Sequence, residues 1–355
     1  MTQDLYKMPV MLEDLEQMSR IPASTLEKLR DTTVLVTGAT GMLGKYIVCW
    51  LMHLNQTLHL NIRILASVRN EQQARAKFES FLGDDNFQIV VHDIVQELHI
   101  SEEVHYVLHT AGLASAHAIS ETPVEVLTTN TLGTLRVLDF ARTNPIKSLL
   151  LASTREIYGA TTGLDKISEN DMGVVDPLDL RSCYPESKRL SEAAFFGYYH
   201  QFGIPMVIGR IAHGYGPGMS LRNDGRVMAD FLYDALSQKE IVITGDPNTE
   251  RAFCYVGDVV EGLLLMLLDG RAGSAYNLAN ETEPVTLLAL ANLVATAAQN
   301  DCKVTLRPNP NRKGYLSYKR TPLDTRKIED LGWKPQVRIE DGIRRTFLSF
   351  GSTLP

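Results

Sequence analysis

The apolar residues of this chain fall into short runs that alternate with segments of helical spacing. Six runs have the length and composition of buried strands: TVLVTG, IRILASV, FQIVVHDI, VHYVLHTAG, IKSLLLAST and PMVIGRIA. Helical patterns lie between them, such as KYIVCWLMHLN after the first run and TLGTLRVLDFAR before the fifth. This alternation predicts βαβ units, and therefore an α/β fold with a doubly wound parallel sheet of the Rossmann type.

The same pattern divides the chain into three parts. Residues 1–30 are expected to form a helical extension, because the stretch from about 12 to 29 has the spacing of one or two short amphipathic helices. Residues 31–212 carry the alternation and form the predicted dinucleotide-binding domain. Residues 213–355 break into short segments with Gly and Pro, which predicts a smaller substrate-binding lobe. Segments near 251–280 are expected to return to the Rossmann domain, so that the two parts interleave in sequence.

Bulk composition narrows the class of protein. The 355 residues are 44% apolar and 22% charged, as in an ordinary globular protein, and carry a formal net charge of −7. This balance argues against a broad nucleic-acid surface, and no apolar run is long enough to cross a bilayer. The four cysteines stand far apart, which argues against zinc and against a disulfide scaffold. Because the N-terminus also lacks the apolar core of a signal peptide, we expect a cytoplasmic enzyme without a bound metal.

A glycine-rich turn follows the first predicted strand. In TGATGMLG, glycines stand between that strand and the next helix, where they let the backbone approach a pyrophosphate. The helix N-terminus then donates free N–H groups to the anion. We therefore predict binding of a nicotinamide dinucleotide. The contacts expected from this loop are Gly38, Thr40, Gly41, Met42, Leu43 and Gly44.

The end of the second strand bears on the choice between NAD and NADP. An Asp or Glu there would accept hydrogen bonds from the adenosine ribose and favour NAD, but this chain has Ser67 and Arg69. Arg69 fits pairing with the 2′-phosphate of NADP, and it equally fits a solvated position or stacking on adenine. The sequence therefore leaves NAD and NADP open. Asp93, after the third strand, is a predicted partner for the adenine amine.

Two further segments carry candidate catalytic residues. YPESK places Tyr184 and Lys188 four residues apart at the start of a predicted helix, so both side chains share one face. An ammonium beside a phenol stabilises the phenolate, which would let Tyr184 accept a proton near neutral pH. LASTREIYG ends the fifth strand with a hydroxyl, a cation and a carboxylate at Thr154, Arg155 and Glu156. These segments gain weight from lying in one chain with the glycine loop.

Together the motifs resemble the extended short-chain dehydrogenases/reductases of the nucleotide-sugar epimerase/dehydratase family. The resemblance runs from about residue 33 to about residue 333, through TGATGMLG, HTAG, TTNTLGTLRVLDFA, LASTREIYG, YPESK, RIAHGYGPG, RAFCYVGDVVEGL and YNLA. Within the family the chain is most similar to the UDP-glucuronate decarboxylases. The resemblance implies a nucleotide-diphosphate sugar as substrate and a homodimer built on paired helices, one of them the Tyr184–Lys188 helix. Further cofactor contacts implied by the resemblance are Ile94, Ala111, Gly112 and Asn130.

The resemblance also implies a mechanism. Thr154 and Tyr184 would handle the proton of the sugar C4 hydroxyl while hydride passes to the nicotinamide, and Lys188 would hold the nicotinamide ribose. The resulting 4-keto intermediate allows decarboxylation, dehydration or epimerisation, with Glu156 as the expected carboxylate for work at C5. Glu156 also fits an ion pair with Arg155 or a loop cap, and Thr154 also fits a plain backbone hydrogen bond.

Three positions depart from the decarboxylase pattern. Arg155 replaces a small hydroxyl residue, His213 replaces an asparagine, and Arg69 stands where an acid is expected. Because Arg155 is too basic for a general acid, we expect it to bind a carboxylate or phosphate of the substrate, or to neutralise Glu156. The other predicted substrate contacts are His213, Arg251 and Arg320, with Lys319 as an alternative to Arg320.

An alternative function keeps the same fold. Arg69 and Arg155 also fit a net reductase that consumes NADPH to reduce a nucleotide-linked keto-sugar or ketose. A binding module without catalysis would keep the scaffold but would not need the set of Thr154, Tyr184 and Lys188. The cofactor balance separates these functions, because a reductase oxidises one cofactor per turnover and a closed cycle consumes none.

Overall fold

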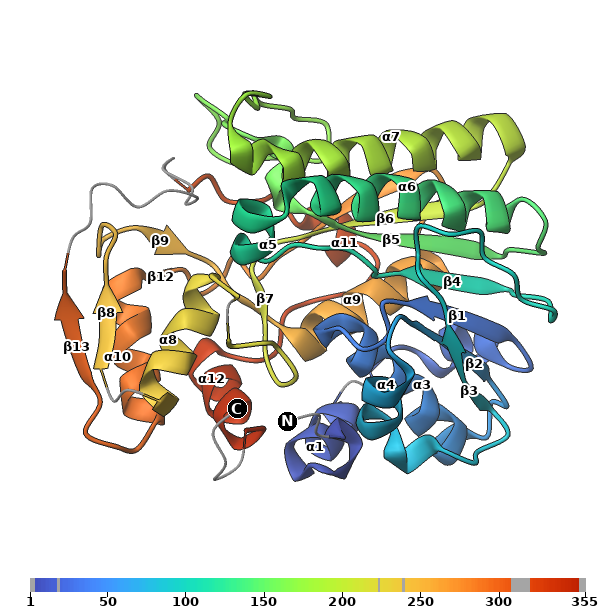
Figure 1. Ribbon diagram of the computed structural model, residues 1–355, viewed down its shortest axis with the longest axis horizontal. Helices are drawn as coiled ribbons and strands as arrows, with labels where there is room; N and C mark the ends of the chain where they lie inside the picture. Colours follow the sequence, from blue (N-terminus) through green and yellow to red (C-terminus); the bar gives the residue numbers. More distant parts are fainter. Residues whose placement is uncertain (1–3, 18–19, 223, 238–239, 308–319, 351–355) are drawn as a thin grey trace.

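A sheet of seven parallel strands lies at the centre of the described part of the protein (Figure 1). The structure is a computed structural model, and it describes residues 4–17, 20–222, 224–237, 240–307 and 320–350. The strands of this sheet are β1 Thr33–Thr37, β2 Arg63–Val68, β3 Phe87–Val91, β4 Tyr106–His109, β5 Ser148–Thr154, β6 Met206–Ile211 and β11 Ser274–Leu278. Their order across the sheet is β11-β6-β5-β4-β1-β2-β3, which confirms the doubly wound α/β fold of the Rossmann type.

The direction in which the sheet grows changes at β1. β1 lies between β2 and β4, and the sheet grows outward from it in both directions. The loops after β1 and β4 therefore diverge and open a crevice at the carboxyl edge of the sheet. The six apolar runs of the sequence form β1 to β6, because a parallel sheet is buried on both faces. β11 comes from SAYNL and pairs with β6 at one edge.

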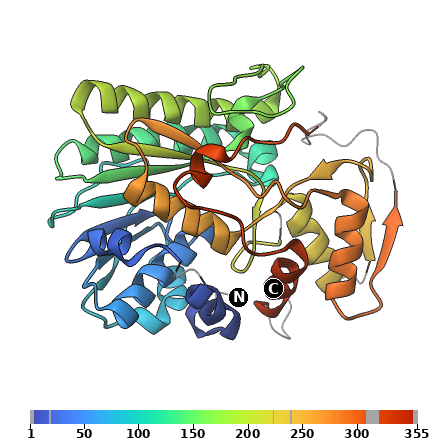
Figure 2. The ribbon, with the colours of Figure 1, turned by 180° about the vertical axis from the view of Figure 1, so that it is seen from behind.

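Helices cover both faces of the sheet (Figures 1 and 2). α3 Met42–Leu58 and α9 Val256–Asp269 pack together on one face, and α6 Pro123–Ala141 and α7 Cys183–Phe202 pack together on the other. α6 begins with Pro123, whose missing N–H is harmless in a first turn, and α7 ends at Gly203 in the left-handed conformation. The shorter helices of this part are α4 Glu71–Lys77, η3 Glu79–Phe81, α5 Ala116–Glu121 and α11 Arg326–Glu329.

A smaller lobe stands at one end of the sheet, at the left of Figure 1. It contains α8 Val227–Ser237, α10 Leu287–Ala297 and α12 Ile339–Leu348, with the parallel pair β8 Glu240–Ile243 and β13 Lys303–Leu306. Two shorter pairs are β7 Gly214–Tyr215 with β10 Cys254–Tyr255, and β9 Glu250–Arg251 with β12 Val285–Thr286. Because α9 and β11 stand between β9 and β12 in the sequence, the chain passes from the lobe to the sheet and back again.

A buried carboxylate fastens the N-terminal segment to the rest of the molecule. This segment contains η1 Leu5–Lys7, α1 Pro9–Gln17, α2 Ala23–Leu26 and η2 Glu27–Leu29. Asp14 on α1 accepts hydrogen bonds from the hydroxyls of Tyr46 at 2.8 Å and Tyr255 at 2.5 Å. Arg345 of α12 donates to the other carboxylate oxygen. Since removing one partner of a buried ion pair costs about 3–5 kcal/mol, this contact ties the first helix firmly to the last.

Candidate active site

The glycine loop joins β1 to α3 where the direction of sheet growth changes. Gly38 has a φ of 66°, and a Cβ atom there would lie 2.6 Å from the Cα of Ala111 in the loop after β4. A Cβ atom on Gly44 would lie 2.5 Å from the Gly38 carbonyl oxygen. Both positions therefore require glycine. Gly41 is the N-cap of α3, so free N–H groups of the helix begin at this loop. This backbone fits the pyrophosphate of a dinucleotide.

The predicted contacts at the adenosine end lie along the carboxyl ends of β1, β2 and β3. The carbonyl of Thr40 accepts a hydrogen bond from Lys77 Nζ at 3.1 Å. This contact places the Lys77 ammonium beside the glycine loop. Arg69 follows β2 and Asp93 follows β3, and both residues are exposed. Ile94 is buried against α6. Arg69 and Asp93 are thus accessible to a cofactor, whereas the side chain of Ile94 packs against α6.

The loop after β4 is held from two sides. The Thr110 hydroxyl donates to the carbonyl of Thr37 at 2.7 Å, and the N–H of Ala111 donates to the Thr37 hydroxyl at 3.3 Å. Asn130 on α6 is 1% exposed, and its side-chain amide bonds both the N–H and the carbonyl of Leu113. The resemblance implies that Asn130 is a cofactor contact, and in the structure its amide is bonded to the backbone of this loop. There it positions the backbone that borders the crevice.

A cavity of about 910 Å³ opens beside this loop and extends into the smaller lobe. The predicted site residues on its wall are Met42, Leu43, Gly112, Thr154, Arg155, Glu156, Tyr184, Lys188, His213, Arg251 and Arg320. Apolar and polar residues of the lobe complete the wall, among them Phe231, Asp246 and Leu287. Candidates from distant segments of the sequence therefore meet in one cavity, with the catalytic set at the sheet and most of the arginines toward the lobe.

Thr154 and Tyr184 meet where β5 ends. Thr154 is the last residue of β5 and the N-cap of the following turn, η4 Arg155–Tyr158. The hydroxyl of Thr154 lies close enough to that of Tyr184 to lower the pKa of the phenol, and both residues are 7% exposed. Burial, with a smaller contribution from the charge of Glu156, raises the pKa of Tyr184 to about 12. The phenol is therefore protonated at neutral pH, and accepting a substrate proton requires added positive charge of the kind an oxidised nicotinamide brings.

Lys188 lies one helical turn after Tyr184 on α7. Its Nζ donates to the carbonyl of Ala152 at 3.0 Å, and a Cβ atom on Gly112 would lie 3.4 Å from it. Burial lowers the pKa of Lys188 to about 8, while the carboxylate of Glu192 works in the opposite direction. Lys188 thus stays mainly protonated at pH 7, next to the loop that borders the cofactor crevice.

Glu156 is bound by an arginine that the sequence did not indicate. Nη2 of Arg181, in η5 Leu180–Ser182, donates to both oxygens of the Glu156 carboxylate at 2.7 and 2.8 Å. Burial raises the pKa of Glu156, and the charges of Arg181, Arg155 and Arg251 offset part of this rise. The hydrogen-bonded partner is therefore Arg181, where the sequence suggested Arg155.

His213 stands among positive charges. Its ring packs on Phe253 with 5.8 Å between the ring centroids, and its backbone has a left-handed φ of 46°. Burial holds the pKa of His213 well below its usual range, and nearby guanidinium groups lower it further. These groups belong to Arg155, Arg251, Arg320 and Arg181. His213 is therefore a neutral imidazole that offers one donor and one acceptor to the cavity.

The arginines reach the cavity from separate segments. Arg155 is 7% exposed and donates from Nη2 to the carbonyl of Thr321 at 3.2 Å. Arg251 in β9 donates to the Glu250 carbonyl at 2.8 Å. Arg320 pairs with Glu281. Its neighbour Lys319 lies outside the described residues.

Arg226 is a second cavity residue that the sequence did not indicate. It precedes α8 and pairs with the buried carboxylate of Asp224, with N···O distances of 2.5 and 2.9 Å. Its charge helps to lower the pKa of Tyr184 against the effect of burial. The sequence around Arg226 carries no signal of this position, since DGRV looks like the surroundings of any solvated arginine.

The described ranges contain neither a cluster of metal ligands nor a membrane-spanning helix. No group of three or more His, Cys, Asp or Glu side chains there could hold a metal ion. None of the described helices combines the length and apolarity needed to cross a bilayer.

Known proteins similar to this chain point to one family. The model of the NAD dependent epimerase/dehydratase family matches residues 34–279. UDP-glucuronic acid decarboxylase 1 of Danio rerio is 32% identical over 335 residues, which cover 94% of this chain and 76% of that protein. UDP-glucuronic acid decarboxylase 6 of Arabidopsis thaliana is 31% identical over 313 residues, which cover 87% of this chain and 86% of that protein.

Solved structures share the fold. An epimerase of Methanothermobacter thermautotrophicus matches with a TM-score of 0.78 at 23% identity, covering 92% of this chain and 94% of that one. UDP-glucose 4-epimerase of Thermotoga maritima matches with a TM-score of 0.75 at 24% identity, covering 90% and 98%. With the family model spanning most of its length and relatives above 30% identity, this chain belongs to the NAD-dependent epimerase/dehydratase family of enzymes.

Proposed function

We propose that the protein binds a nucleotide-diphosphate sugar in the cavity and oxidises its C4 hydroxyl to a ketone. The observation that carries this proposal is the meeting of Thr154, Tyr184 and Lys188 beside the loop of Gly112. A bound nicotinamide supplies the hydride acceptor. Tyr184 takes the hydroxyl proton, Thr154 orients the neighbouring phenol, and Lys188 supplies positive charge that favours the phenolate.

The cations of the cavity wall support an anionic substrate. The wall carries the basic residues Arg155, Arg181, Lys188, Arg226, Arg251 and Arg320, and the acidic residues Glu156, Asp246 and Glu250. A diphosphate brings about two negative charges and a carboxylate on the sugar brings about one more, and guanidinium groups bind both kinds of anion. We therefore propose a nucleotide-diphosphate uronic acid. UDP-glucuronate, after which the curated relatives are named, is the first compound to test.

Decarboxylation is the proposed step after oxidation. A ketone at C4 stands β to the carboxylate on C5, so the bond from C5 to the carboxylate carbon breaks and CO₂ leaves. The electron pair passes to the C4 oxygen as an enolate, and C5 then takes a proton. Return of the hydride to C4, with the proton held by Tyr184 going to the C4 oxygen, would give the pentose and restore the oxidised cofactor. Arg155 sets the share of turnovers that end in decarboxylation. A guanidinium paired with the substrate carboxylate stabilises the group that must lose its charge when CO₂ leaves. Dehydration and epimerisation at the same ketone are the competing outcomes.

The proposed cofactor contacts leave room for a phosphate on the adenosine ribose. Arg69 is exposed at the carboxyl end of β2, and the acid that would hold a free ribose is absent from that strand end. We propose that the protein accepts NADP as well as NAD, with Arg69 against the 2′-phosphate.

The outer surface of α6 and α7 supports a homodimer. Val124, Leu127, Leu190 and Phe196 lie on this pair of helices and are between 40% and 72% exposed. Large apolar side chains exposed together on neighbouring elements are typical of an interaction surface. We propose that a second copy of the chain covers them, and the mass in solution measured by light scattering tests this directly.

The reaction is tested with the purified protein and UDP-glucuronate, UDP-glucose and dTDP-glucose, each with NAD or NADP. Mass spectrometry and NMR of the product report loss of CO₂, loss of water or inversion at C4, and absorbance at 340 nm reports the cofactor. The expected result is a UDP-pentose from UDP-glucuronate without net redox change. Stoichiometric oxidation of NADPH by a keto-sugar nucleotide would instead establish the reductase. Conversion of none of these compounds would contradict C4 oxidation.

A further inference from the structure

The end of β5 contacts α7 at three consecutive residues. The side chain of Thr154 lies beside that of Tyr184, and the carbonyl of Ala152 accepts a hydrogen bond from Lys188 at 3.0 Å. Between them, the hydroxyl of Ser153 donates to Oε1 of Glu192 at 2.5 Å, with both residues buried. Two of these contacts belong to the catalytic set described above. The third, between Ser153 and Glu192, has no role in that set.

Glu192 continues the spacing of the catalytic pair. Tyr184, Lys188 and Glu192 stand at four-residue intervals, so they follow one another along the inner face of α7. All three are less than 10% exposed. The carboxylate of Glu192 therefore lies one helical turn beyond the ammonium of Lys188, away from solvent, where charges act on each other more strongly than in water.

Arg210 of β6 holds this carboxylate in place. Its Nη2 donates to Glu192 at 2.7 Å and its Nε donates at 3.1 Å, with both side chains at or below 10% exposure. Its Nη1 donates to the Tyr158 hydroxyl at 3.0 Å and to the Glu169 carbonyl at 2.8 Å. Glu192 therefore has a fixed position and a neutralising partner, as a buried carboxylate requires.

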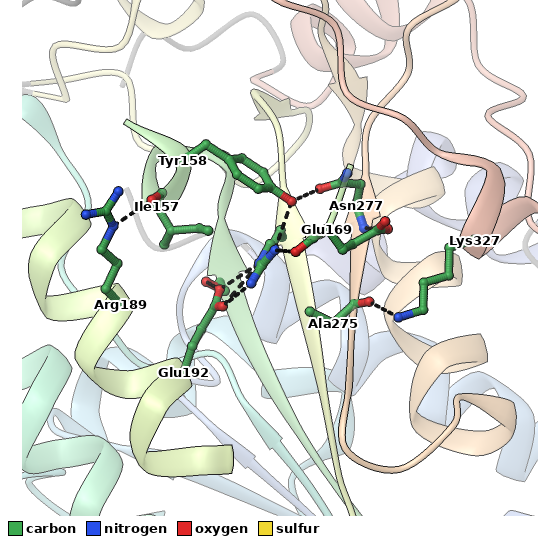
Figure 3. Close-up of polar contacts among 10 residues, drawn as sticks. Ile157, Tyr158, Glu169, Arg189, Glu192, Ala275, Asn277 and Lys327 are labelled. Atoms are coloured by element: carbon green, nitrogen blue, oxygen red, sulfur yellow. Dashed lines mark hydrogen bonds and ion pairs between the residues drawn. The ribbon is translucent and has the colours of Figure 1, made fainter. Parts of the chain in front are cut away.

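The network extends to the edge of the central sheet (Figure 3). Tyr158, in the turn after Thr154, donates its hydroxyl to Oδ1 of Asn277 on β11 at 2.5 Å. The Asn277 amide in turn donates to two backbone carbonyls at 3.0 Å. Glu192 is thus the catalytic-side end of a rigid chain of hydrogen bonds that begins in β11 and passes through β6.

We propose that Glu192 is a positioning residue: it keeps Lys188 charged, and through Ser153 it fixes the strand end with Thr154 against the helix with Tyr184. It touches neither substrate nor cofactor. The inference rests on the proposed function only for the role that it gives to Lys188 in turnover, since the charge state of Lys188 can be measured without any substrate.

The surroundings of Lys188 leave Glu192 as its counter-charge. Burial lowers the pKa of Lys188 to about 8, and Glu192 is the group that raises it against burial. His109, on β4, is neutral above acid pH because burial lowers its pKa to about 3, with the charge of Lys188 contributing. The groups around the neighbouring Tyr184 are Glu156, Arg181 and Arg226. Without Glu192, Lys188 keeps the hydrogen bond to the carbonyl of Ala152 but loses its counter-charge.

The experiment measures the titration of Lys188 directly. NMR of the cofactor-free protein carrying ¹³C-labelled lysine follows the Lys188 signal with pH, and the signal is assigned by its loss in Lys188→Met. We expect Glu192→Gln to lower the midpoint by about one pH unit or more. Glu192→Asp, which keeps the charge, should restore most of the wild-type value. An unchanged midpoint in Glu192→Gln overturns the inference.

Matched variants separate this effect from general damage. Glu186→Gln removes a carboxylate from the same helix, where it pairs with Arg189 and is 40% exposed, and it should leave the Lys188 midpoint unchanged. Should Glu192→Gln fail to fold because Arg210 is left unpaired, the double variant Glu192→Gln/Arg210→Gln removes both charges. Because loss of the Arg210 cation works in the opposite direction, the midpoint should fall less than in Glu192→Gln, and a midpoint that does not fall overturns the inference.

Steady-state kinetics test the second part of the proposal, the contact between Ser153 and Glu192. Ser153→Ala keeps the charge of Glu192 but removes the bond between β5 and α7, so kcat should fall about three- to tenfold with KM and the Lys188 midpoint unchanged. An unchanged kcat overturns the positioning role of Ser153. If no nucleotide sugar is converted, the proposed function fails, while the NMR measurement still decides the inference.

Discussion

The two ends of the cavity are built in different ways. At the inner end, Thr154, Tyr184 and Lys188 are buried on β5 and α7, and Lys188 donates a hydrogen bond to the backbone of β5. At the outer end, arginines arrive on turns, loops and the two-residue strand β9. Proton and hydride transfer require reacting atoms to be held within a fraction of an ångström, which rigid elements provide. Recognition of phosphates and carboxylates tolerates longer, more adaptable side chains.

The electrostatics of the two ends differ as well. The inner end has few charges, and burial moves the pKa values of Tyr184 and Lys188 to about 12 and about 8. At the outer end, acidic residues are paired with arginines, as in Glu156 with Arg181 and Glu281 with Arg320. These pairs limit repulsion among the arginines while the wall keeps an excess of positive charge. The comparison teaches that burial sets the protonation states at the inner end, whereas ion pairs dominate the outer end.

Removing the phenol should have the largest effect. Tyr184→Phe should lower turnover of UDP-glucuronate by about 10³-fold or more, since it removes the proton acceptor, and should leave NAD affinity within about twofold. Steady-state kinetics and cofactor titration measure the two quantities. Tyr198→Phe, on the outer side of the same helix where the hydroxyl bonds Asp139, is the control. Near-wild-type rates in Tyr184→Phe would show that Tyr184 is not the proton acceptor.

Removing Arg155 should act mainly on binding. Arg155→Ser should raise KM for UDP-glucuronate about 10- to 100-fold, as expected for the loss of a hydrogen bond to a charged group. The fraction of turnovers that release CO₂ should rise as well, because the carboxylate is less stabilised. KM for UDP-glucose, which lacks the carboxylate, should change less. Equal effects on both substrates would show that Arg155 binds the diphosphate. Arg344→Ala, at a solvent-exposed arginine, is the control.

The cofactor end extends the comparison beyond the cavity. Arg69→Ala should weaken NADP about tenfold and leave NAD nearly unchanged if the guanidinium binds the 2′-phosphate. Fluorescence titration with each cofactor measures this ratio. Equal loss for NAD and NADP would show that Arg69 stacks on adenine. Arg75→Ala, at an exposed position of α4, should change neither affinity.

The smallest effect concerns carboxylates of α9, away from both ends. Burial raises the pKa of Glu261 to about 7 and that of Asp258 to about 6. Because the folded protein holds these protons more tightly than the unfolded chain, stability present near pH 5 is lost as pH rises through about 6 to 7. Glu261→Gln, which does not ionise, should therefore gain a few degrees in Tm relative to wild type between pH 5 and pH 8. A difference in Tm that stays constant with pH would contradict the raised pKa.

Local sequence was enough to predict the elements and the inner end. The glycine loop, the strand that ends in Thr154 and the helix that opens with Tyr184 and Lys188 each fit within a short segment. Backbone sterics, strand burial and helical spacing act over such distances, so their signatures survive in the sequence. β11 was less visible, because its five residues follow the long apolar helix α9 without a distinct pattern of their own.

Partner choice was decided only in the tertiary structure. Glu156 pairs with Arg181, 25 positions further along the chain. Asn130 on α6 bonds the backbone of Leu113, and Glu192 on α7 pairs with Arg210 on β6. Charged side chains have the same appearance in a sequence whether they are solvated or paired, because only the fold determines which of them lose water together. The sequence by itself thus determined the fold, the cofactor loop and the Tyr–Lys pair. The tertiary structure decided which charges face the cavity and which hold it in shape, because desolvation and pairing depend on residues that are brought together only by the packing of distant segments.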